Sequence, residues 1–138
     1  MSRDGSVELD FAGERRKFRL AWGELELLQE SRETGPYILL DRLLSGHWRV
    51  QDIAEVIRLG LIGGGARPDE AQKLVKAYVQ ARPPLETLVI AQRVLGAGVA
   101  GTPDEELGKK AEAANPDGNS PNSQTENSDL PPSTATGP

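Results

Sequence analysis

The fold is decided by residues 50–65, VQDIAEVIRLGLIGGG, a short apolar segment that runs into three glycines. Its apolar residues recur at steps of three and four, which places them on one side of a 3.6-residue helical period. These residues are Val50, Ile53, Val56, Ile57, Gly60 and Leu61. The opposite side carries Gln51, Asp52, Glu55 and Arg58. We therefore expect an amphipathic helix that faces the core and is ended by glycines with left-handed backbone angles.

Residues 7–20 predict a β-hairpin before this helix. Apolar and charged residues alternate on both sides of residues 12–14, with the apolar ones at Val7, Leu9, Phe11, Phe18 and Leu20. A period of two places these side chains on one buried face of a hairpin. The basic residues 15–17 then pair across the strands with acids of the first strand. Because an isolated hairpin is marginal in water, its apolar face must pack on helices.

Helical spacing continues through the rest of the body. Residues 21–30, 37–44, 68–79 and 85–95 carry apolar residues at steps of three and four. In the last of these segments the predicted core stripe is Leu85, Leu88, Val89, Gln92 and Leu95, and the helix is expected to loosen through the glycines that follow. The predicted class is α+β: mostly α, a compact bundle of about five short helices with a small N-terminal hairpin.

The last part of the chain has a different composition. Residues 103–138 contain only two large aliphatic residues, Leu107 and Leu130, among Pro, Ser, Asn, Gly, Thr and acids. Such a segment cannot bury enough apolar surface to offset its ordering entropy, so we expect one helical domain, 1–102, and a disordered acidic tail, 103–138. Residues 1–102 hold 14 Lys or Arg and 14 Asp or Glu, whereas residues 103–138 hold 2 and 7, which accounts for the whole net charge of −5.

Composition excludes several classes of function. The body is neutral and lacks the basic excess that favours nucleic acid. With no Cys in the chain, disulfides and thiolate metal sites are excluded. No apolar run approaches the roughly 20 residues that span a bilayer, and the first residues lack the apolar core of a signal peptide. The expectation is a soluble cytoplasmic protein that contacts neither nucleic acid nor membrane.

Candidates for chemistry are few. His47 is the only histidine and lies in a predicted turn, so we interpret it as a surface or half-buried turn residue. Glycines 63–65 precede a helix but follow no strand and lack the Gly-Lys-Ser/Thr ending of a phosphate loop, which favours a flexible joint. Glutamates 24, 26, 30 and 33 do not have the spacing of a calcium loop and predict a solvated helix face. We expect no catalytic residue, cofactor or metal, and no enzyme.

The aromatic residues outside the hairpin are the candidates for protein contacts. Trp22 falls on the apolar stripe of residues 21–30, so we expect it in the core. Trp48 lies between two predicted helices, where it either fills the core or offers a contact to a partner. The predicted partner-binding residues are Tyr37, Trp48 and Tyr78.

Three stretches resemble the phage tail assembly chaperone family of gene transfer agents and related siphophages. The first is the hairpin with the apolar and acidic segment LAWGELELLQE, residues 20–30. The second is LLSG, residues 43–46, followed by VQDI, residues 50–53, and the third is RLGLIGGG, residues 58–65. The resemblance covers residues 5–98. Relatives in this family also carry the label of tail tube proteins.

The resemblance implies a non-enzymatic role in tail assembly inside a bacterial host cell. Chaperones of this kind coat the tape-measure protein, recruit tail tube protein to it and leave as the tube polymerises, and in several phages a frameshift produces a longer form. The alternative is a structural minor tail or tail tube subunit of the particle, and a homo-oligomer is compatible with both. A DNA-binding helical module is disfavoured by the neutral body.

Overall fold

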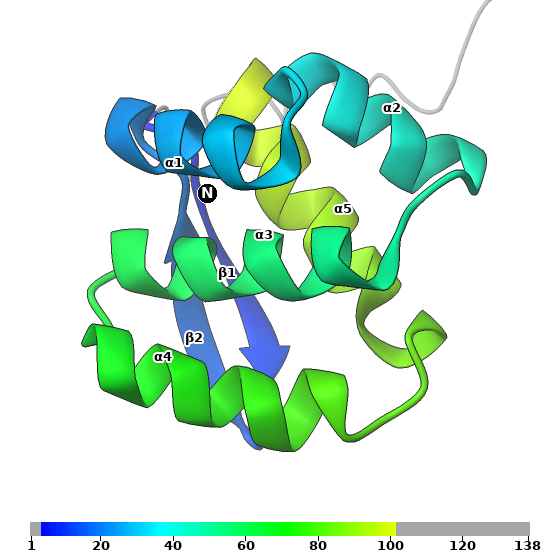
Figure 1. Ribbon diagram of the computed structural model, residues 1–138. Coiled ribbons are helices and arrows are strands. Elements are labelled where there is room, and N and C mark those ends of the chain that lie inside the picture. Colours follow the sequence, from blue (N-terminus) through cyan, green and yellow to red (C-terminus); the bar gives the residue numbers. More distant parts are fainter. Residues whose placement is uncertain (1–3, 102–138) are drawn as a thin grey trace, which may run out of the picture. The chain divides into compact units, whose positions relative to one another are not determined.

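The computed structural model describes residues 4–101, and the predicted tail lies outside this part of the chain. The described residues form an antiparallel hairpin followed by five α-helices (Figure 1). The elements are β1 Ser6–Phe11, β2 Glu14–Arg19, α1 Trp22–Arg32, α2 Pro36–Ser45, α3 Val50–Gly63, α4 Pro68–Val75, the π-helical turn η1 Lys76–Gln80, and α5 Leu85–Ala100. The predicted fold class, mostly α with a small N-terminal hairpin, is confirmed.

The hairpin turns through two residues, Ala12 and Gly13, both with positive φ (55° and 81°). This backbone shape matches the right-handed twist of the strands and favours glycine at the second position. The register pairs Val7 with Phe18 and Asp10 with Arg15. One face is therefore apolar and buried, as predicted, while the other carries charge pairs such as Arg15 with Asp10 at 3.5 Å.

Helix α3 is the central element of the described body. It packs against β2 and against α1, α2, α4 and α5 (Figure 1). The predicted stripe is buried except for Val50, whose side chain is 55% exposed because it begins the helix, beyond the cover of its neighbours. Asp52 and Leu59, on the other side, are also buried, since α1 covers that side. The prediction that Asp52 faces outward is wrong.

Helix α5 is rotated relative to the predicted stripe. Leu85 and Val89 are exposed, whereas the residues buried in this helix are Thr87, Ala91, Val94, Leu95 and Ala97. Between Glu86 and Arg93 the helix is apolar on nearly all sides, so apolar spacing alone cannot select its buried face. The helix also continues through Gly96 and Gly98 to Ala100, and does not loosen there. A Cβ on Gly98 would lie 2.9 Å from Leu20 Cβ, so this glycine permits close packing.

The glycine cluster after α3, residues 63–65, also differs from the prediction, which was a flexible joint with left-handed backbone angles. Of its members only Gly65 has a positive φ, at 118°, whereas Gly64 is close to helical with φ −84°. Gly63 and Gly64 lie directly against the backbone carbonyls of Arg19 and Lys17 in β2. The cluster is therefore a packing contact between α3 and the hairpin and not a flexible joint.

Two helix ends show why the chain turns where it does. Proline opens α2 and α4 at the first helical turn, where its missing amide costs nothing. Helix α2 ends at Gly46, which has left-handed angles (φ 88°) and donates its amide to Arg42 O. Glu33 ends α1 in the same conformation, with φ 58°.

Replacing Gly46 by alanine is expected to lower the free energy of unfolding by about 1 kcal/mol, because a Cβ disfavours left-handed angles even where space is open. Gly46→Asn is the matched control, since asparagine tolerates this conformation better and should lose less. Urea unfolding followed by circular dichroism measures both. Equal losses for the two variants would show that the backbone angle is not the cause.

Candidate interaction surfaces

Large apolar side chains lie exposed on four helices of the described body. They are Trp22, Leu27, Tyr37, Ile38, Leu44, Val50, Leu85 and Val89. Single exposed apolar residues are normal on a soluble protein, but groups of them mark contact sites. Two places on the surface combine such residues with charge.

The first place is the apolar end, which we define by Leu44, Val50, Leu85 and Val89. These residues come from the last turn of α2, the first turn of α3 and the first turns of α5, which meet at one end of the described body (Figure 1). The surface includes a groove of about 440 Å³ between α3, η1 and the start of α5. The groove is lined by Val50, Ile53, Ala54, Val79, Arg82 and Pro84, among others.

Interactions between helices hold the apolar end in place. Gln92 Nε2 donates a hydrogen bond of 2.9 Å to Leu43 O and so ties α5 to the end of α2. Arg82 lies 5.2 Å above the ring of Tyr78 and forms an ion pair of 3.7 Å with Glu86. The Arg82 contacts fix one side chain that lines the groove, and the Gln92 bond holds α5, whose start borders the groove, so its shape is largely preformed.

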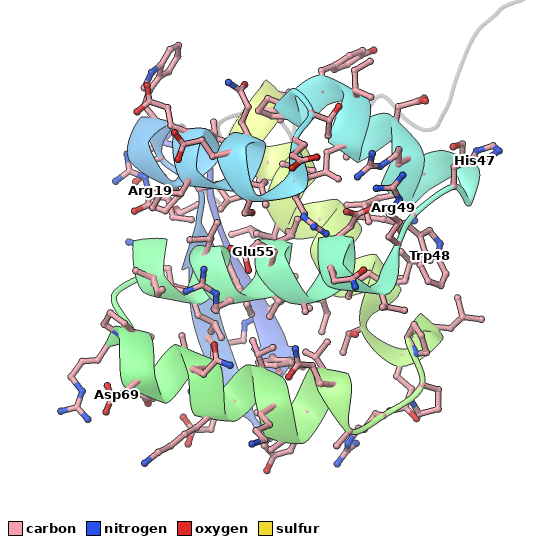
Figure 2. All side chains as sticks on the ribbon, in the orientation of Figure 1. Arg19, His47, Trp48, Arg49, Glu55 and Asp69 are labelled. Carbon is pink, nitrogen blue, oxygen red and sulfur yellow. The ribbon has the colours of Figure 1, made fainter. Side chains whose placement is uncertain are left out.

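The rim of the apolar end is basic. Arg49 precedes Val50, is exposed, and takes part in none of the ion pairs of residues 4–101. Figure 2 shows Arg49 together with His47 and Trp48 at this end. Arg82 adds a second guanidinium, but its ion pair with Glu86 compensates this charge, so the net positive charge of the rim comes from Arg49.

The second place is the outer side of α1, which we call the acidic α1 stripe: Trp22, Glu26 and Glu30. The three residues are spaced by four, so they follow one another along the same side of the helix. All three are exposed, and the two glutamates form no ion pair within the described residues. The prediction of a solvated acidic face is confirmed for Glu26 and Glu30, whereas Glu24 is half-buried and accepts the Ala21 amide at 3.0 Å.

The prediction that Trp22 packs in the core is wrong, because its side chain is 80% exposed. Leu28 is the only buried residue of α1, and Leu25 packs against the core beside it. Trp22 lies about 120° around the helix from Leu28, since each residue turns the chain by about 100°. Only a narrow side of α1, around Leu25 and Leu28, contacts the core, and the spacing of apolar residues does not show how narrow this side is.

Trp22→Ala is expected to change the free energy of unfolding by no more than about 0.5 kcal/mol, as for other exposed positions. The comparison is Leu25→Ala, a partly buried residue of the same helix that packs against the core, which should lose clearly more. Thermal unfolding by circular dichroism measures both. A loss at Trp22 as large as that at Leu25 would contradict the exposed position.

The predicted partner-binding residues lie on three separate elements. Tyr37 is 71% exposed on the first turn of α2. Trp48 is half-buried in the segment between α2 and α3 and packs partly against the core, next to the apolar end. Tyr78 in η1 is half-buried, with its ring 6.1 Å from that of Phe11 and under Arg82. Tyr78 is thus engaged in packing, and a role for any of the three in binding stays a prediction.

A buried ion cluster at Asp52 was not predicted from the sequence. Asp52 is 0% exposed, and its Oδ1 accepts hydrogen bonds from Arg32 Nη1 at 3.2 Å and Arg42 Nη2 at 2.9 Å. Its Oδ2 accepts the Arg49 amide at 2.8 Å and so caps α3. The cluster joins α1, α2 and α3. An acid in the first turn of α3 was the only local signal of the cap.

The remaining sequence candidates show no arrangement for chemistry. His47 is exposed, with Nδ1 2.9 Å from Ser45 Oγ. Within residues 4–101, no group of three His, Cys, Asp or Glu side chains could hold a metal ion. No helix of this part of the chain is long and apolar enough to cross a membrane.

Exposed apolar side chains over a preformed groove indicate a protein that works through contacts with other proteins. The family described as "Phage tail tube protein, GTA-gp10" matches residues 4–101, and the chain belongs to this family. Comparisons with curated proteins and with solved structures gave no match. The predicted resemblance to a phage tail family is thereby confirmed, although the family description names a tube protein and not an assembly chaperone. A tail family is structural, which favours a protein that assembles with other tail components and has no enzymatic activity.

Proposed function

We propose that the protein is a structural subunit of a phage-like tail, whose exposed apolar surfaces become covered by neighbouring tail subunits. The family match carries this proposal, because it extends over residues 4–101, all of the described body. The apolar end supports it, since Leu85 and Val89 are 68% and 58% exposed next to a groove that a partner side chain can fill. Such a surface loses contact with water only through assembly.

Quantitative mass spectrometry of purified particles tests this proposal. A structural subunit is expected in a fixed ratio to the other tail proteins, and deletion of its gene should give particles without complete tails. Complementation with the wild-type gene controls for effects on neighbouring genes. Absence of the protein from particles that need it for assembly would contradict a structural role.

The second candidate is a tail assembly chaperone that binds the tape-measure protein and tail tube protein in the bacterial cytoplasm and then leaves. Within residues 4–101 the sheet has only the two strands β1 and β2, which favours this candidate, because a tube wall built from sheets needs more strands. A preformed apolar groove also suits helical segments of a long partner. Co-expression with the tape-measure protein tests it, and a chaperone should increase the amount of soluble tape-measure protein.

A further inference from the structure

We propose that the acidic α1 stripe of one copy docks on the apolar end of a second copy, so that the protein associates head to tail. This inference deepens the proposed function, because it names a second copy of the chain as a partner of the apolar end. Trp22 is the anchor of the contact. The charges around both surfaces set its orientation.

The two surfaces are complementary in chemistry. Trp22 is the most exposed large apolar residue within residues 4–101, and tryptophan is enriched among residues that dominate the energy of protein contacts. The groove at the apolar end has a volume of about 440 Å³, with apolar walls from Val50 and Pro84, and accommodates an indole ring. An exposed aromatic side chain and an unfilled apolar groove thus occur on the same chain.

The two surfaces are also complementary in charge. One and two helical turns beyond Trp22, Glu26 and Glu30 are exposed without ion-pair partners in the described residues. Arg82 lines the groove, and the exposed Arg49 lies one residue before the start of α3, which forms one wall of the groove. With Trp22 in the groove, the glutamates face this basic rim, whereas two acidic stripes would repel one another. Complementary charge therefore favours a contact of unlike surfaces over a symmetric contact between two α1 helices.

The surfaces lie at opposite ends of the described body. Helix α1 begins at the end where Figure 2 labels Arg19, and α3 begins at the other end, where it labels Arg49. One copy therefore cannot fill its own groove with its own Trp22. Each copy can use both surfaces at once, and such contacts produce a closed ring or an open filament.

Sedimentation velocity of the full chain tests the proposal with two variants. The first removes the stripe (Trp22→Ala with Glu26→Lys), and the second blocks the apolar end (Val50→Asp with Leu85→Asp). All four positions are exposed, so both variants should stay folded, which circular dichroism verifies. The wild type is expected to form species larger than dimers at about 100 µM, where contacts of micromolar affinity are nearly saturated.

Each variant alone should be predominantly monomeric, with self-association weakened by at least about a hundredfold, because each removes two residues of the contact. An equimolar mixture should form a one-to-one dimer that grows no further, because only one intact contact remains between the two variants. Ile38→Ala is the matched control, since this exposed apolar residue of α2 belongs to neither surface and its loss should leave association unchanged. Added salt should weaken the wild-type contact.

Three results would overturn the proposal: a monomeric wild type, a mixture that does not associate, or an Ile38→Ala variant as defective as the stripe variant. If the wild type is monomeric but binds another purified tail protein through Trp22, the stripe serves a different partner and self-association is wrong. A monomeric protein that is nevertheless present in particles in fixed ratio would refute only the self-association. Absence from particles would refute only the structural role.

Discussion

Replacing Asp52 by alanine is expected to lower the free energy of unfolding by about 3 kcal/mol, because it leaves two largely buried arginines without their counter-charge. The side chains of Arg32 and Arg42 are 18% and 19% exposed, so water compensates them only in part. The change also removes the acceptor of the Arg49 amide. For a domain of this size, such a loss corresponds to a fall in the unfolding temperature of more than about 12 °C.

Two further variants separate the causes of this loss. Asp52→Asn keeps an oxygen that can accept the Arg49 amide but removes the charge, so its loss should lie between those of the wild type and the alanine variant. Asp69→Asn is the control, because its ion pair with Arg67 is exposed and should contribute less than about 1 kcal/mol. Urea unfolding followed by circular dichroism measures all three. If Asp52→Ala resembled Asp69→Asn, the cluster would not hold α1, α2 and α3 together.

The elements of the fold could be predicted because their signals are local. Alternation in residues 7–20, the proline at position 36 and the glycine at position 46 each act within a few residues, and the observed boundaries follow them. The identity of the central helix was also predictable, since residues 50–63 combine strong periodicity with the smallest residues at one end. These features depend on the chain alone and not on what packs against it.

The orientation of the helices could not be predicted in the same way. Helix α5 has few polar residues to mark an outer side, so its buried side is selected by small residues that fit against neighbours, such as Ala91 and Gly98. Asp52 is buried because two arginines from other helices reach it. Both facts depend on contacts between segments distant in sequence, which periodicity does not report.

The same limit applies to the candidate surfaces. Tyr78 is one of the predicted partner-binding residues, but it packs on Phe11. Trp22, which is expected in the core, is the most exposed large apolar residue of residues 4–101. The apolar end could not be found from the sequence at all, because it joins the end of α2 with the first turns of α3 and α5. Each of these three helices contributes one or two apolar residues. In the sequence pattern of its own helix, such a residue looks like a core position.

Replacing Gly64 by alanine is expected to cost about 3 kcal/mol or more, because the added Cβ would overlap the carbonyl oxygen of Lys17. The obstacle is backbone, so it cannot rotate away as a side chain would, and α3 must separate from β2. Gly63→Ala should behave alike, since its Cβ would meet the carbonyl of Arg19. In both cases the φ angle is tolerable for alanine, and the loss therefore reports the close approach alone.

Gly96→Ala is the matched control for this prediction. Gly96 lies within α5, and an added Cβ would meet no atom within 4 Å. Alanine there should raise the free energy of unfolding by about 0.5 to 1 kcal/mol, because it restricts the unfolded chain and favours the helix. Opposite signs for Gly64 and Gly96 in the same urea titration would establish that the cluster after α3 holds the helix on the hairpin. Gly64→Ala with wild-type stability would show instead that a flexible joint can yield there.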